Sequence, residues 1–591
     1  MVVRVAALRR IAFLARTHWA VAVVLALYAA SAFVVPTLTD VPVNDDWFYA
    51  HSVENLLQQH VLTSGQVTTT LIFQVVWGAL FASLFGMTYG VLRLSTVVAV
   101  FLSGWALYGL CRELAIARAR SALGVALYLF NPLSFVLGFT FMSDSHFTAL
   151  LIPATLLYVR GMRAGSRDRW LVLVASAVSA LAFLVRHHGI LIPLAVVSHL
   201  ALSRRLRWDI DSLSLLGRVA AIPVVTAGMY FLWLRFAHGV PGGQSSFLKD
   251  VLSAGVPSTV LLGWLLAFFE SMYAGFFVLP LAAAAIPATV YLIRSTPPPG
   301  RRLFGVWTVV MLVPAVISVW LRLLMPYIPS FLTRAGLGPN DLLVARPGLV
   351  HRHALIWPTV TCALSAVVLG LALCRKIGTG EAPRHAGARL VLVIALWQAA
   401  GVVLPSFARI GWQVDGVPSP SLDRYLLPLL PLVVCLALWA LHDVRLVAPL
   451  AWLTTGVFAI FAIAGTRDSL LLHRATWDLA RRANQLGVAN TRLDGGATWD
   501  ASHLSEYSRT GSVPLRTPEY EYSTGNPDSL LTPTPPWWIW AWAPATDSSY
   551  VIVGERLIGF DVVDQIEYSS WLHRRPMPLY LVRRPGAPEP R

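Results

Sequence analysis

The stretch Asn44-Asp45-Asp46-Trp47-Phe48-Tyr49 places two adjacent carboxylates and three aromatic rings a few residues beyond the first long apolar run of the chain. One interpretation makes it the solvated start of a helix, with Asn44 or Asp45 as the N-cap and an acidic residue in the first turn. The other interpretation is chemical, because a chain this apolar carries few charges. Both interpretations stay open on this stretch alone, and the rest of the chain bears on them.

The composition is that of an integral membrane protein. Of 591 residues, 56% are hydrophobic and 13% are charged, whereas soluble domains carry about 25% charged residues. Apolar segments of roughly 20 residues recur, each long enough to cross a bilayer. The formal charge of +16 does not indicate nucleic-acid binding. The basic residues cluster in short loops between apolar runs, as expected for loops on the cytoplasmic side.

The order of apolar runs and basic loops predicts an all-α polytopic domain of about 13 transmembrane helices over residues 1–466. The first span, at 19–36, follows four arginines and is too long for a signal peptide, so we expect an uncleaved span with a cytoplasmic N-terminus. The run 66–85 is amphipathic and is predicted to lie at the interface. The run 256–293 predicts an outer-leaflet helix followed by a separate span. These features predict a multi-pass protein of the inner (plasma) membrane.

Residues 467–591 predict a small extracytoplasmic domain of α/β or α+β type. Residues 476–486 fit a helix, and residues 550–553 and 579–582 fit buried strands. All four cysteines lie at or before Cys435, so this domain has no disulfide. The Trp-rich run 535–542 fits an interfacial aromatic belt or a docking surface better than a sugar platform.

Three carboxylates stand at predicted span boundaries on the outward side. These are Asp45, Asp46 and Asp144, and an ionisable group at membrane depth is usually paired or functional. Asp144 is followed closely by His146, but Ser143 or Asp144 also suits the N-cap of the fourth span. A cap and a site role do not exclude each other, so both stay open.

Two basic groups end spans on the side that positive charge normally avoids. Arg186-His187-His188 closes the fifth span, and Arg424-Tyr425 opens the twelfth. Such residues often extend to the headgroups without further function. Their outward position favours a bound anion instead.

Four motifs, in order and on the same side of the membrane, give the chain a family resemblance. They are Asp45-Asp46 with Tyr49, Leu84-Phe85-Gly86 with Leu92-Arg93-Leu94, Met142-Ser143-Asp144, and Arg424-Tyr425-Leu426-Leu427-Pro428. The chain resembles the GT-C fold glycosyltransferases that use polyprenyl-phosphate sugars, and within them the protein O-mannosyltransferase and lipid A aminoarabinose transferase branch. It departs by having Asp-Asp where that family commonly has Asp-Glu, and histidines where a Gln-like residue follows the span-5 arginine.

The resemblance implies transfer of a hexosyl or pentosyl group from a polyprenyl-phosphate-linked donor to an acceptor hydroxyl of a protein, lipid or glycan, with inversion, at the outer face of the membrane. Asp45 would be the general base and Asp46 a supporting group. The donor phosphate would meet Arg186, Arg424, Tyr49 and Tyr425. Asp144, His146 and His187 would contact the acceptor or a divalent metal, Mg²⁺ or Mn²⁺.

Two other functions fit the same features. A polyprenyl-linked glycan transporter or flippase would show two related halves around a central path, and no such symmetry stands out in the sequence. A non-catalytic membrane protein that binds lipid-linked sugar would keep the acidic pair without turnover. The sequence alone leaves the second of these open.

Overall fold

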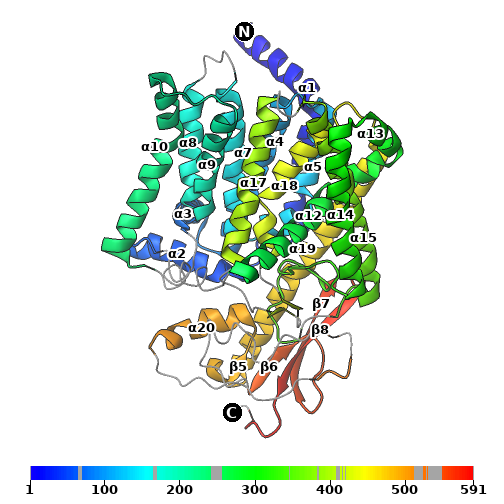
Figure 1. Cartoon of the computed structure of the whole chain (residues 1–591). Helices are drawn as coiled ribbons and strands as arrows, with labels where there is room; N and C mark the ends of the chain where they lie inside the picture. Colours follow the sequence, from blue (N-terminus) through cyan, green and yellow to red (C-terminus); the bar gives the residue numbers. More distant parts are fainter. Residues whose placement is uncertain are drawn as a thin grey trace.

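The computed structural model describes residues 2–63, 70–163, 169–240, 256–344, 347–381, 385–406, 413–414, 417–418, 421–510, 523–526, 529 and 549–589. Figure 1 shows a bundle of helices with a smaller domain, containing the β-sheet, against one end. We call the end of the bundle that bears this domain the domain face, and the opposite end the far face.

Helices from the first half of the chain form one side and part of the middle of the bundle (Figure 1). Their bounds are α1 (Val2–Val34), α2 (Asp46–Gln59), α3 (Ile72–Phe85), α4 (Tyr89–Glu113), α5 (Arg118–Leu129), α6 (Pro132–Gly138), α7 (Ser143–Gly161), α8 (Trp170–Phe183), η1 (His187–Ile190), α9 (Leu191–Leu202), α10 (Ile210–Trp233) and η2 (Leu234–His238).

Helices from the second half complete the bundle, and the last of them continues into the domain. Their bounds are α12 (Val256–Ala285), η3 (Ile286–Ala288), α13 (Thr289–Ser295), α14 (Pro298–Trp320), η4 (Arg352–Leu355), α15 (Ile356–Gly378), α17 (Ala386–Ser406), η6 (Asp423–Leu426), α18 (Leu429–Ala440) and α19 (Ala448–Gln485). Two short hairpins lie in connecting segments, β1 (Leu332–Thr333) with β2 (Gly336–Leu337) and β3 (Gln413–Val414) with β4 (Val417–Pro418).

The predicted helical membrane architecture is confirmed in its main features. Within the described ranges, seven helices are long and apolar enough to cross a membrane, or eight if α5 and α6, bent by 63°, form one span. Five further apolar helices have 10–17 residues. A count of thirteen crossings therefore stays a prediction.

The structure differs from the sequence prediction at the run 256–293. The helix α12 runs without a break from Val256 to Ala285, and η3 follows it close to the far face. The predicted division into an outer-leaflet helix and a separate span is therefore wrong. Pro280 lies inside α12 without ending it. The helix predicted from residue 66 begins at Ile72.

The C-terminal domain has a four-stranded sheet in the order β5-β6-β8-β7. Its elements are η7 (Asn490–Arg492), β5 (Leu493–Asp494), α20 (Ala497–Thr510), β6 (Tyr550–Val553), β7 (Asp561–Ser570) and β8 (Arg575–Arg583). Strand β5 is parallel to β6, and the other pairs are antiparallel. Both predicted strands are confirmed, as β6 and within β8. The Trp-rich run 535–542 lies outside the described residues.

One helix joins the bundle to this domain. The predicted boundary at residue 467 falls inside the 38-residue helix α19. The neighbouring Asp468 is fully buried, and its carboxylate accepts hydrogen bonds from the Ser570 hydroxyl and from the Trp571 and Leu572 backbone N–H groups at 2.6–2.9 Å. These bonds fix the β7–β8 turn against the helix where the domain begins.

The segment that carries the acidic pair is also tied to the domain. Val41 is buried in the same hydrophobic cluster as Leu342, Leu472 and Trp499. The Arg93 guanidinium donates to the Thr37, Thr39 and Val41 carbonyl oxygens, each at 2.9 Å. Arg93 itself is fully buried. The course of the chain just before Asp45 is therefore set by both the bundle and the domain.

Candidate functional site

Asp45 occupies the N-cap position of α2, as one interpretation of the sequence predicted, but its side chain faces a cation. It is the residue before α2, but its side chain makes no capping hydrogen bond. Its Oδ2 atom instead accepts a hydrogen bond from Arg424 Nη1 at 2.9 Å. The Asp45 side chain is 20% exposed and that of Arg424 is 10% exposed. The carboxylate is thus partly open to an incoming group.

Asp144 forms a second pair of the same kind. The N-cap residue of α7 is Met142, so the prediction that Ser143 or Asp144 caps this helix is wrong. The Asp144 carboxylate accepts a hydrogen bond from Arg186 Nη1. The Asp144 side chain is only 1% exposed, and such a charge is tolerated at this depth because it is paired. The fold thus brings a carboxylate and a guanidinium from two predicted span ends into direct contact.

Two tyrosines join the pairs into one cluster. The Tyr425 ring centroid lies 5.0 Å from the Arg186 guanidinium carbon and 5.4 Å from that of Arg424. These are cation–π distances, which leave part of each guanidinium free for other partners. Burial raises the pKa of the Tyr49 hydroxyl, and the charges of both carboxylates and both guanidinium groups act on it.

We call this set the paired-charge cluster. Its members are Asp45, Tyr49, Asp144, Arg186, Arg424 and Tyr425. They come from α2 and the residue before it, from α7, from η6 and from the residue before η1, so segments distant in the sequence meet here. A cluster with two cations, two carboxylates and an aromatic ring between them can bind a phosphate and hold a base beside it.

Asp423 holds the backbone of this cluster in place, a role that the sequence prediction missed. Its carboxylate is fully buried and accepts the backbone N–H groups of Ser330, Phe331 and Leu332 at 2.7–3.2 Å. Burial raises the pKa of Asp423 to about 6, against the effect of these hydrogen bonds. The position of the adjacent Arg424 is therefore fixed by the connecting segment between α14 and α15.

The Asp46 side chain points into the protein interior. It is 1% exposed, and its Oδ1 atom accepts a hydrogen bond from the Phe141 backbone N–H at 3.0 Å. Burial raises the pKa of Asp46 to about 7, although the nearby Arg93 guanidinium lowers it. The two members of the acidic pair thus occupy different environments, one facing a cation at the cluster and one linking α2 to the turn before α7.

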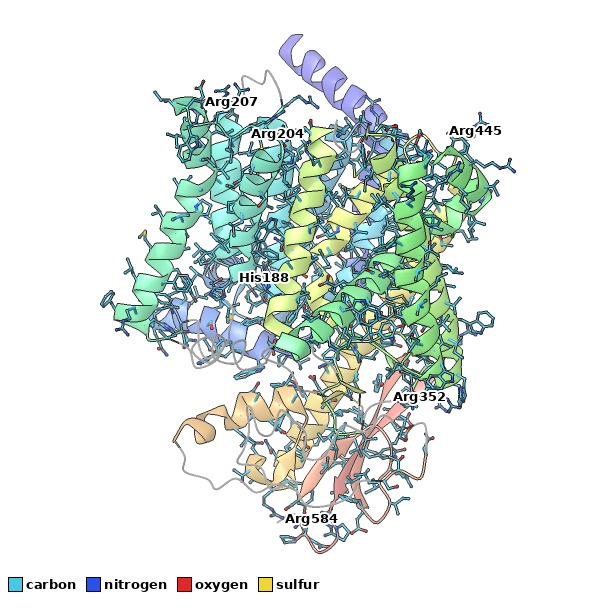
Figure 2. The ribbon with its side chains drawn as sticks, in the orientation of Figure 1. His188, Arg204, Arg207, Arg352, Arg445 and Arg584 are labelled. Carbon is cyan, nitrogen blue, oxygen red and sulfur yellow. The ribbon has the colours of Figure 1, made fainter. Side chains whose placement is uncertain are left out.

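The two histidines lie apart from each other. His146 is buried beside the Phe141 ring, and its Nδ1 atom is 3.1 Å from the Met142 carbonyl oxygen. His187 packs among the rings of Phe183, Tyr230 and Phe231. The adjacent His188 lies within the bundle, with Nε2 at 2.8 Å from the Gly401 carbonyl oxygen (Figure 2).

The donor set does not fit a divalent cation as it is placed. The Asp45 and Asp144 carboxylates are each bonded to a guanidinium group. Within the part of the chain that the structure describes, no group of three or more His, Cys, Asp or Glu side chains could hold a metal ion. Mg²⁺ and Mn²⁺ prefer sites rich in carboxylate oxygens.

Residues 75–231 match the family model described as dolichyl-phosphate-mannose-protein mannosyltransferase. This stretch contains Arg93, Asp144 and Arg186, and its match confirms the resemblance to the GT-C membrane glycosyltransferases. It is a minor part of the 591 residues, so the activity of the whole chain remains a proposal. No curated protein matches the chain.

Several solved structures are similar to the chain. They include ArnT from Cupriavidus metallidurans bound to undecaprenyl phosphate (15% identity, 97% of this chain and 100% of that chain, TM-score 0.38) and the same protein in the apo state (15%, 96% and 98%, 0.39). Another is AglB from Archaeoglobus fulgidus, an oligosaccharyltransferase in complex with an inhibitory peptide and a dolichol-phosphate (11%, 84% and 59%, 0.34). All these TM-scores lie below 0.5, so the likeness does not by itself establish a shared fold.

Proposed function

We propose that the protein is an inverting glycosyltransferase that moves a sugar from a polyprenyl-phosphate donor to an acceptor hydroxyl, with the paired-charge cluster as its active site. The observation that carries this proposal is the pairing of a partly open carboxylate, Asp45, with the guanidinium of Arg424. The match of residues 75–231 to a family that uses a dolichyl-phosphate sugar supports the donor class.

The residues provide a single displacement. The acceptor oxygen attacks C1 of the donor sugar from the face opposite the phosphate, and the C1–O bond to the lipid phosphate breaks with its electron pair. Asp45 takes the proton of the acceptor hydroxyl. Arg424 and Arg186 stabilise the departing lipid phosphate. One displacement inverts the anomeric centre, and each part of it is assigned to a side chain of the cluster.

The Asp45–Arg424 ion pair implies that the donor binds before Asp45 acts as the base. The Asp45 oxygen that accepts the hydrogen bond from Arg424 is less available to an acceptor hydroxyl. A donor phosphate near Arg424 competes for the same N–H groups, since guanidinium binds phosphate with two parallel hydrogen bonds. Donor binding would therefore release Asp45 for the acceptor, so that the base becomes competent only when a donor is present.

We further propose that the domain face is the outer face of an inner (plasma) membrane and that the N-terminus is cytoplasmic. Basic loops gather at the far face, and Figure 2 shows Arg204, Arg207 and Arg445 there. Cytoplasmic loops carry such an excess of arginine. The donor lipid would then present its phosphate to the cluster from the outer leaflet.

The test is incubation of purified protein with radiolabelled polyprenyl-phosphate sugars. We expect release of polyprenyl phosphate, by transfer or by slow hydrolysis, and loss of that release in Asp45→Asn. Movement of intact donor across a vesicle membrane without cleavage would favour the transporter. Saturable donor binding with no cleavage by the wild type would favour the non-catalytic sugar-binding protein.

A further inference from the structure

Five arginines surround the junction of the bundle with the C-terminal domain. They stand on four segments: Arg322 follows α14, Arg334 lies in the β1–β2 turn, Arg352 begins η4, and Arg574 and Arg575 lie at the β7–β8 turn. All are exposed except Arg334, which is half-buried. Figure 2 shows Arg352 at the domain face, beside the strands. We call this set the basic rim.

Hydrogen bonds bring these segments together. The Met325 backbone N–H, three residues after Arg322, donates to the Thr359 hydroxyl in the first turn of α15 at 2.9 Å. The Leu349 N–H donates to the Arg334 carbonyl oxygen at 2.9 Å. His573, next to Arg574, lies 3.2 Å from the Pro347 carbonyl oxygen through Nε2. The rim is therefore one surface built from distant parts of the chain.

The basic rim has no protein counter-charge. Across the described residues, none of its five arginines forms an ion pair, and Arg334 Nε is buried without a hydrogen-bond partner. Asp341 is the single acidic residue between positions 271 and 380. It is buried and lies 3.1 Å from His473, so it does not neutralise the rim.

Some arginines at the far face are paired within the protein. Arg160 and Arg163 both pair with Glu113, at 2.7 and 2.9 Å. Arg375 pairs with Asp443 at 2.6 Å. The far face therefore neutralises part of its positive charge internally, although it is the side where the basic loops gather.

Exposed tryptophans place the rim at the level of the lipid headgroups. Trp320 is 79% exposed, Trp357 73% and Trp571 48%. Each is close in sequence to a rim arginine. Tryptophan side chains are enriched at the membrane–water interface because their rings are amphipathic. Guanidinium groups at this level meet lipid phosphates, which they bind through paired hydrogen bonds.

We propose that the basic rim binds the phosphate groups of anionic phospholipids in the leaflet on the domain side. Charge complementarity carries this assignment, because the five cations form no ion pair within the described part of the chain and anionic lipid phosphates can meet them at headgroup depth. The basic rim shares no residue with the paired-charge cluster, and this proposal does not depend on the transfer reaction. Its consequence is that the junction between bundle and domain would be surrounded by anionic lipid.

Native mass spectrometry of the full chain from detergent micelles containing equal phosphatidylglycerol and phosphatidylcholine tests this proposal. The triple variant Arg352→Gln, Arg574→Gln, Arg575→Gln should retain about 10- to 100-fold less phosphatidylglycerol than wild type. Retention by wild type should also fall as salt is raised. The matched control is a far-face triple variant, Arg204→Gln, Arg207→Gln, Arg445→Gln. It should lose less phosphatidylglycerol than the rim triple does.

Two outcomes would overturn the proposal. One is unchanged phosphatidylglycerol retention in the rim triple. The other is an equal loss in both triples, which would show a general effect of net charge and no site at the junction. Thermal unfolding of each variant checks that the comparison is made between folded proteins. All six positions are exposed, so little change in the unfolding temperature is expected.

Discussion

The carboxylate of Asp45 and the guanidinium of Arg424 lie 2.9 Å apart, although 379 positions separate them in the chain. One comes from the segment before α2 and the other from the short helix before α18. This contact joins the first and last parts of the bundle at a point where the carboxylate is still partly exposed. If Asp45 is a catalytic base, loss of its charge should lower the transfer rate. If the ion pair is purely structural, the same change should lower thermal stability.

Asp45→Asn should reduce the transfer rate by roughly 10²–10⁴-fold, because Asn cannot accept the acceptor's proton. Donor binding should not weaken, since a neutral Asn competes less with the phosphate for Arg424, and thermal stability should change little, since Asn still accepts a hydrogen bond from Arg424. The measurement is single-turnover release of polyprenyl phosphate from a saturating donor. Asp46→Asn is the matched control, and it should keep most activity because Asn can accept the Phe141 N–H bond that Asp46 accepts.

An active Asp45→Asn with an inactive Asp46→Asn would move the base to the second carboxylate. Full activity in both variants would remove this stretch from the catalytic centre. A loss of thermal stability in Asp45→Asn that matches its loss of activity would support the structural ion pair instead.

Arg424→Ala should weaken donor binding and lower turnover by roughly 10²–10³-fold, as expected for loss of one donor to a developing anion. Arg424→Lys keeps the charge but not the planar fork, so it should recover only part of the activity. Titration with polyprenyl phosphate separates binding from chemistry. Wild-type affinity and rate in a folded Arg424→Ala would contradict a role at the donor phosphate.

Asp423→Ala should destabilise the protein by about 1–3 kcal/mol, because it leaves buried backbone N–H groups without an acceptor. It should also lower kcat, since Arg424 would lose its fixed position. Asp423→Asn retains one acceptor oxygen and should recover part of both properties. Thermal unfolding and kcat are measured together. Loss of stability without any change in kcat would limit Asp423 to a structural role.

A buried carboxyl pair in the C-terminal domain predicts a pH effect on stability. Asp494 and Asp500 are almost fully buried and accept the Gly496 and Gly495 N–H groups, at 3.1 and 2.9 Å. Burial raises the pKa of both carboxyls. A raised pKa stabilises the fold below the unfolded value of about 3.9, and this contribution is lost as pH rises through the folded value.

Asp500→Asn removes one ionisable group from that pair. Its unfolding temperature relative to wild type should therefore rise between about pH 4 and pH 7. Thermal unfolding across this range measures the difference. A constant difference at all pH values would show that the two carboxyls do not titrate in the folded domain.

Membrane sidedness is tested by labelling introduced cysteines in intact cells, with half-buried Cys374 replaced by Ser. Glu567→Cys, exposed on β7, should react with an impermeant maleimide from outside. Asp211→Cys, exposed in the first turn of α10, should react only after permeabilisation. The reverse pattern would invert the proposed orientation.

The sequence predicted the helical bundle, the small domain and two of its four strands because their apolar periodicity and length are local properties. It also singled out every member of the paired-charge cluster, since charges beside apolar spans are conspicuous. The role of Asp423 could not be predicted, because its three N–H donors lie 91–93 positions earlier in a connecting segment. The pairing of Asp45 with Arg424 could not be predicted either, because the two residues are 379 positions apart and meet only through packing of the bundle. The burial of Asp46 likewise depends on contacts with residues distant in the sequence.

The continuity of α19 determines how the two substrates would reach each other. At 38 residues the helix is about 57 Å long. It enters the domain without a linker, and the bonds of Asp468 fix the first turn of the sheet beside it. The domain is therefore joined to the bundle by a continuous helix and by these hydrogen bonds. In the proposed reaction a lipid donor would diffuse in the plane of the membrane and an acceptor would arrive from the water, so the acceptor would have to reach the paired-charge cluster past this attached domain.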